Sequence, residues 1–196
     1  VGVDYLLDLE LLPYDIQGTK AQAKMLRKIK ILTDKELALA LKGLNEVLRL
    51  WKAGKFKIDK SQEDGHTAIE AYLTQKYGEV GKKIHTGRSR NDQSLTMTRL
   101  FGKEKLLEIK HELKNLIRVL GRQVEKQGKI KMPGYTHMQR AMPSSVGMWL
   151  GSYHDSLQDG IVLIDATLKV IDQNPLGSAA GYGENTLGLD RKFTTR

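Results

Sequence analysis

Three polar segments carry most of the side chains in this sequence that can bind or transform a ligand. KIHTGRSRNDQ spans residues 83–93 and contains one histidine, two arginines, two hydroxyls, an asparagine and an aspartate. GYTHMQRAMPSS spans residues 134–145, and NPLGSAAGYG spans residues 174–183. Arginine, asparagine, serine and threonine donate hydrogen bonds to carboxylates. The composition of these segments therefore favours binding of a small anionic molecule.

Two of these segments lead into long predicted helices. From about Ser89 to about Lys126 there is no proline, and apolar residues recur every three or four positions. A second such pattern follows Pro143 and ends before Asn174-Pro175, because the residue before a proline disfavours helix. A helix N-terminus offers unpaired N–H groups and the positive end of the helix dipole. The two helix starts, with the glycine-rich third segment, could together hold a polyanion.

The same apolar periodicity predicts an all-α fold with no convincing strand. Shorter helices are expected along a stripe from Ala21 to Leu32, from a Thr33/Glu36 capping box to near Gly54, and over residues 66–78. The long helices carry stripes that predict a helix-bundle core, with a two-stranded coiled coil as the alternative. Helices of this length commonly pack against copies of themselves, so a homo-oligomer is expected. The stripes comprise Leu106, Ile109, Leu113, Leu116 and Leu120 in the first, and Leu150, Tyr153, Leu157, Ile161, Ile164, Leu168 and Ile171 in the second.

Each polar segment also has a simpler interpretation. The first could be a solvated turn that caps the next helix. Ser144 or Ser145 as an N-cap would explain the serines of the second, but not Thr136, His137 and Gln139. The glycine-rich segment lacks the strand that a dinucleotide-binding fold requires. The five histidines, at positions 66, 85, 111, 137 and 154, show no ligand spacing, so no metal site is expected.

Composition excludes several classes of protein. The chain has 32 basic and 23 acidic residues and a net charge of +9, which raises nucleic acid as a partner. The lysines are interleaved with glutamates along helical segments, however, and no basic run contains stacking aromatics, so no nucleic-acid binding is expected. No apolar run approaches the roughly 20 residues that span a bilayer, and no signal peptide is evident. We therefore expect a cytoplasmic location and no membrane association. The absence of cysteine excludes disulfides and agrees with a reducing compartment.

The segments HTGRSRNDQ, GYTHMQRAMP and NPLGSAAGYG, in this order and spacing, resemble the argininosuccinate lyases, a branch of the fumarase/aspartase superfamily. The resemblance extends over the chain, through YDIQGTKA, EDGHTAIE and GLDRKFTT. It implies a helical N-terminal domain over residues 1–88, a long-helix domain over residues 89–196 that is incomplete at its C-terminal side, and a tetramer with shared active sites. The implied reaction is a reversible, cofactor-free β-elimination of argininosuccinate to arginine and fumarate. A related fumarate-releasing lyase is the less favoured assignment.

The resemblance also assigns roles to individual residues. Ser89, Arg90 and Asn91 match substrate-binding positions, with Asn91 and Thr136 donating hydrogen bonds to the substrate carboxylates, and Gln139 is included among the substrate-binding residues. The resemblance also assigns Thr136 a catalytic role.

Two histidines match positions near the family's active site. His137 occupies the place of the catalytic histidine, where it either accepts a proton or orients a neighbouring group. His66 occupies a position near the substrate, and a structural role at a helix start is the equal alternative.

Two departures from the family pattern stand out. Asp4 lies where many members have a substrate-contacting serine. The family's third segment, a glycine-serine loop before Met-Pro-x-Lys-Lys-Asn, is absent from the 196 residues. We therefore expect this chain to be part of a longer enzyme and to be inactive alone. The alternatives are a non-catalytic relative, like the crystallins built on this fold, and a basic oligomeric nucleic-acid-binding module.

Overall fold

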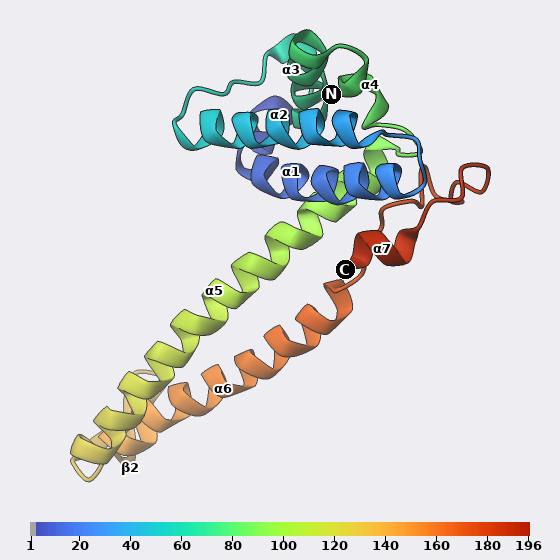
Figure 1. The fold of residues 1–196 in the computed structure, drawn as a ribbon. Helices are drawn as coiled ribbons and strands as arrows, with labels where there is room; N and C mark the ends of the chain where they lie inside the picture. The colour runs from blue at the N-terminus through green and yellow to red at the C-terminus, as the bar shows by residue number, and fades with distance from the viewer. Residues whose placement is uncertain (1–2) are drawn as a thin grey trace. The chain divides into compact units, whose positions relative to one another are not determined.

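The computed structural model describes residues 3–196 and is mainly helical (Figure 1). The helical fold class predicted from the apolar periodicity is confirmed. In chain order, the elements are α1 (Asp4–Lys28), α2 (Asp34–Lys52), the short 3₁₀ helix η1 (Lys60–Gln62), α3 (Gly65–Tyr77), α4 (Glu79–Lys83), α5 (Arg90–Gln127), β1 (Lys131–Thr136), β2 (Gln139–Ser145), α6 (Val146–Ile171) and α7 (Arg191–Thr195).

The chain divides into two compact units. Unit 1 contains the described chain up to Phe101 together with Gln173–Arg196, and unit 2 contains Gly102–Asp172. Helix α5 begins in unit 1 and ends in unit 2. The first turns of α5 and the chain after α6 thus belong with the N-terminal helices. The domain division at residue 88 suggested by the family resemblance stays a prediction.

Unit 1 has a well-buried apolar core. Its main cluster joins α1, α2, α3 and α4 through Leu12, Ile16, Ala40, Leu44, Val47, Ile69, Leu73, Val80 and Ile84. A second cluster of Ala23, Met25, Leu26 and Leu32 packs against Leu189 and Phe193, so α7 returns to α1. Burial of this amount of aliphatic surface is the main stabilising contribution to unit 1.

Local capping signals in unit 1 act as the sequence predicted. The Thr33 hydroxyl accepts the Glu36 N–H at 3.2 Å, and the Glu36 carboxylate accepts the Thr33 N–H at 2.8 Å, which makes a capping box at the start of α2. Gly78 ends α3 with a φ of +63°, a conformation that glycine adopts without steric cost. The first helix, Asp4–Lys28, both begins and ends earlier than the predicted stripe from Ala21 to Leu32; the apolar pattern missed its first half because polar Asp15, Thr19 and Gln22 lie on its buried face.

Unit 2 consists of the rest of α5, a β-hairpin and α6. Ion pairs link the two helices in antiparallel order: Lys103 pairs with Asp172 at 2.5 Å, and Lys110 pairs with Asp165. The long-helix predictions are confirmed, since α5 has 38 residues and α6 has 26. The predicted bundle core is not formed within this unit, because no described residue between 102 and 172 is fully buried.

The hairpin corrects the prediction that the chain contains no strand. β1 and β2 pair antiparallel from Lys131 opposite Ser145 to Thr136 opposite Gln139, with an irregularity near Gly134. Pro133 and Pro143 face each other, which a two-stranded sheet tolerates because both strands are edges. Most of the hairpin is exposed, so its sequence lacks the alternation that identifies a half-buried strand.

Candidate functional site

The Ser89–Asn91 segment forms the N-terminal end of α5, as predicted. The Ser89 hydroxyl accepts the Asn91 N–H at 3.2 Å, and Asp92 accepts the Ser89 N–H at 3.1 Å. Asn91 is exposed, and its side-chain amide forms no hydrogen bond with any residue between 3 and 196. This helix start therefore presents a free amide beside the positive end of the dipole of α5, which suits a carboxylate ligand.

Arg90 points towards the start of α3. Its guanidinium donates to Glu63 at 3.2 Å and to the Thr67 hydroxyl at 3.0 Å, and it lies 3.3 Å from Asp64. About half of the side chain is exposed. A bound carboxylate must compete with Glu63 and Asp64 for this cation. The sequence did not reveal these partners, because they lie more than 20 residues away along the chain.

His66 is buried near the start of α3, where its Nδ1 lies 2.5 Å from Asp15 on α1. Among the described residues, its Nε2 has no hydrogen-bond partner. Asp64 is the N-cap of α3 and accepts the Thr67 N–H at 2.8 Å, so the helix is capped without His66. Burial raises the pKa of Asp15, but His66, Gln93 and Arg88 together lower it more, and the net pKa is below its ordinary value.

A buried polar network extends from this pair below the start of α5. Asp15 accepts hydrogen bonds from Thr19 at 3.1 Å and from Gln93 at 2.9 Å. Arg88 donates to Thr19 at 3.0 Å. Burial lowers the pKa of the Arg88 guanidinium, while neighbouring carboxylates that include Asp15 oppose the shift. The opposite charges stabilise one another where neither is solvated.

Sequence reasoning missed this network, although one signal was available. Asp15, Thr19 and Gln22 follow one another at helical spacing on α1 and share its buried face. Gln22 donates to the Thr86 carbonyl at 3.0 Å and so ties the first polar segment to α1. When polar residues share a helix face with apolar core residues, they are buried and must find hydrogen-bond partners, which indicates a buried polar network.

The glycine-rich segment lies beside the same end of α5. The N–H groups of Gly177 and Ala179 both donate to Asp92, at 3.1 and 2.9 Å. Gly177 has a φ of +89°, and Ala179 has a φ of +50°. Residues other than glycine seldom adopt such positive φ values. The first and third polar segments are thus brought together in unit 1.

Thr136, His137 and Gln139 lie in unit 2, in and beside the turn of the hairpin. Thr136 and Gln139 face each other across the two-residue turn His137-Met138. Both turn residues have positive φ, 50° and 61°, as in a type I′ turn, which usually contains asparagine and glycine. All four residues are exposed, and within residues 3–196 the side chains of Thr136, His137 and Gln139 form no hydrogen bond. Ser145 is the N-cap of α6, so the simpler interpretation of that serine is correct.

Other features of the structure lie apart from these residues. Asp4 is exposed at the first position of α1.

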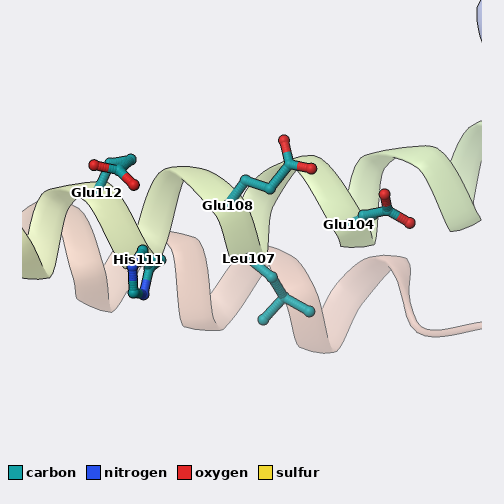
Figure 2. A pocket seen from close by; sticks show the side chains of 5 residues that line it. All are labelled: Glu104, Leu107, Glu108, His111 and Glu112. Carbon is teal, nitrogen blue, oxygen red and sulfur yellow. The ribbon is translucent and has the colours of Figure 1, made fainter.

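A shallow surface depression is lined by Glu104, Leu107, Glu108, His111 and Glu112, which all project from α5 (Figure 2). It includes none of the predicted site residues. Among residues 3–196, no three His, Asp or Glu side chains gather so as to hold a metal ion.

No described helix is long and apolar enough to cross a membrane.

Comparison with known protein families gives a match over nearly the whole chain. The model of a family described as "Lyase" matches residues 4–196. Argininosuccinate lyase of Thermotoga neapolitana is 44% identical over 196 residues, which are 100% of this chain and 49% of that protein. Argininosuccinate lyase of Bacteroides fragilis is 45% identical over 195 residues, which are 100% of this chain and 43% of that protein. The chain therefore spans about half the length of the curated relatives it matches.

Solved structures have a similar fold. A variant of EDDS lyase with bound fumarate superposes with a TM-score of 0.84 and 28% identity, over 96% of this chain and 37% of that one. A structure described as fumarate lyase and delta crystallin, from Brucella melitensis, superposes with a TM-score of 0.79 over 97% of this chain and 46% of that one. At 16% identity, the second match concerns the fold alone.

Proposed function

The chain belongs to the lyase family, and we propose that it forms part of an argininosuccinate lyase, which splits argininosuccinate into arginine and fumarate. The observation that carries this proposal is the identity of 44–45% to proteins of that name over the whole chain. That region of identity spans all of the polar segments described above. A structural match to an EDDS lyase variant with bound fumarate agrees with release of a dicarboxylate product.

The proposed reaction needs three chemical functions. A base removes a proton from the carbon beside a carboxylate, and the doubly charged aci-carboxylate that forms must be stabilised by hydrogen-bond donors. The carbon–nitrogen bond then breaks, and the departing guanidino nitrogen takes up a proton. The electron pair of the broken C–H bond becomes the new double bond of fumarate. The family resemblance implies that the reaction proceeds without a cofactor.

We assign the binding of the substrate carboxylates to both polar regions. Ser89, Arg90 and Asn91 stand at the positive end of α5, where the Asn91 amide is free to donate. Thr136 and Gln139 contribute from the hairpin. We also assign His66 to the surroundings of the substrate; its unpartnered Nε2 is buried in the single chain, so contact with a ligand would require neighbouring groups to move.

We assign proton management to the hairpin turn, with His137 as the base or as the group that orients it, and Thr136 beside it. The positive φ of His137 supports this assignment, because strained backbone of this kind is concentrated at functional sites. Its exposure also argues against the interpretation of His137 as a core histidine.

We further propose that the protein is a homotetramer in the cytoplasm and that its subunits share active sites. The Ser89–Asn91 segment and the hairpin are separated along the chain by the whole of α5 and belong to different units. Large apolar side chains remain exposed on α5 and α6, including Leu116, Leu163 and Val170. Burial of such surface against other copies of the chain is the expected driving force for assembly.

The test is to measure fumarate release from argininosuccinate by the complete protein, with adenylosuccinate and aspartate as competing candidates. We expect turnover of argininosuccinate alone. Turnover of another substrate would identify a related lyase, and a folded oligomer with no turnover of any of them would support the non-catalytic, crystallin-like alternative.

A further inference from the structure

Asp92 is the most completely buried carboxylate beside the proposed binding segment. It lies in the first turn of α5, directly after Asn91, and is 0% exposed. One oxygen, Oδ1, accepts the N–H of Ser89 at 3.1 Å. The other oxygen, Oδ2, accepts the N–H groups of Gly177 and Ala179 at 3.1 and 2.9 Å. One side chain thus connects the helix start with the glycine-rich segment.

We propose that Asp92 is a positioning residue, which fixes Ser89, Arg90 and Asn91 against the loop of residues 174–183. This inference rests on the proposed function for its kinetic consequences. Its structural part stands on the three hydrogen bonds alone. Asp92 itself is too buried to touch a substrate, so it acts through the residues that it holds.

The loop conformation supports this role. Ala179 adopts a φ of +50° at the point where its N–H meets Asp92. Such a conformation is unfavourable for alanine and persists only where neighbouring contacts hold it. Gly177 has a φ of +89° and no room for a side chain, since a Cβ there would lie 2.9 Å from the Arg191 side chain. Asp92 contacts the loop at both of these constrained positions.

An ordinary helix cap would not require this arrangement. An aspartate that only capped α5 would need the bond between Oδ1 and the Ser89 N–H, which satisfies a helix-start donor. The second oxygen would then face water. Here it is buried and accepts from a segment 85 residues further along the chain. Burial of a carboxylate is costly unless it is fully hydrogen-bonded, and these loop N–H groups meet that requirement together with the nearby charge of Arg88.

The first test is Asp92→Asn in the complete protein. An amide is nearly the same size, but it replaces one acceptor oxygen with a donor that faces an N–H group. We expect faster hydrogen exchange at Gly177 and Ala179, or at Ser89. We also expect kcat to fall and KM to rise together, with kcat/KM reduced about 10- to 100-fold, because a displacement of about 1 Å can cost a factor of that order.

The matched control is Leu44→Ala in the core of unit 1, which loosens the same unit without contacting the loop. A purely structural loss lowers the fraction of active protein, so kcat falls while KM stays constant. Asp92→Glu keeps the charge and both acceptors but moves them by one methylene. It should fold and still show a raised KM, which preserves the test if Asp92→Asn does not fold.

Two results would overturn the proposal. One is unchanged amide exchange at Gly177, Ala179 and Ser89 in Asp92→Asn, or in Asp92→Glu if only that variant folds. The other is an unchanged KM in an active variant of Asp92. If the wild-type protein releases no fumarate, the proposed function fails, whereas amide exchange still decides whether Asp92 holds the loop.

Discussion

The start of α5 and the β1–β2 turn carry the two halves of the proposed site, and their surroundings differ sharply. At the start of α5, Asp92, Arg88 and Gln93 are buried, and contacts from α1, α3 and the 174–183 loop surround the segment. At the turn, His137 and its neighbours are exposed and have no side-chain hydrogen bond within the described residues. One region is organised by contacts with its own chain, whereas the other has no such contacts among the described residues.

The largest effect is expected at the turn. His137→Ala should lower kcat about 10²–10⁴-fold, as for the loss of a proton-transfer group, with a much smaller change in KM. The melting temperature should stay the same, because His137 packs against no core residue. Steady-state kinetics and thermal unfolding of the complete protein provide the measurement. Met138→Ala, in the same turn with 88% of its surface exposed, is the control and should keep its activity. An effect on melting temperature alone would favour a structural role for His137.

The second largest effect is a difference between the two units in how core substitutions change the free energy of unfolding. Leu44 is 0% exposed, so Leu44→Ala should lower the free energy of unfolding by about 2–5 kcal/mol at any protein concentration. Leu116 is 47% exposed in the single chain, so Leu116→Ala should matter mainly through assembly. Its effect on the denaturation midpoint should therefore depend on protein concentration. A cost for Leu116→Ala that is independent of concentration would contradict the proposed burial between subunits.

Smaller kinetic effects are expected from the carboxylate-binding residues. Asn91→Leu and Thr136→Ala should each remove one charge-assisted hydrogen bond, which costs about 1.5–3 kcal/mol or roughly 10- to 100-fold in kcat/KM. Asn115→Leu makes the same change as the first variant further along α5, outside the proposed site, and serves as the control. Wild-type kinetics in a well-folded Asn91→Leu protein would remove Asn91 from the site.

The smallest effect concerns acid stability in unit 1. Hydrogen bonds from Lys83 and Thr33 lower the pKa of Glu36 from 4.5 to about 2. A lowered folded-state pKa stabilises the fold above pH 4.5, and this contribution is lost as the pH falls from 4.5 towards 2. Glu36→Gln should flatten the decline of melting temperature in that window. An unchanged pH profile in Glu36→Gln would show that the contact with Lys83 contributes nothing measurable.

The sequence predicted the features that depend on near neighbours. The Thr33/Glu36 capping box, the glycine end of α3 and the two long helices all follow from local spacing, and all are confirmed. The hairpin could not be predicted in this way, because it is exposed and contains Pro133 and Pro143. His-Met is also an unusual pair for its turn type.

The site was only partly predictable for a related reason. The polar segments were identifiable from their composition, and the helix start of Ser89–Asn91 followed from the periodicity of α5. The contacts of Asp15 with His66 and of Asp92 with Gly177 join positions 51 and 85 residues apart. No local pattern encodes such pairs, because they arise only when the helices pack.

The central claim is that one reaction uses the start of α5 from one subunit and the hairpin from another. The most direct measurement is to unfold and co-refold the complete Asn91→Leu and His137→Ala proteins and to assay fumarate release from argininosuccinate. Mixed oligomers should contain some sites with both Asn91 and His137, so turnover should rise well above that of either variant refolded alone. Mixed oligomers confirmed by mass, with no more activity than their parents, would contradict the claim.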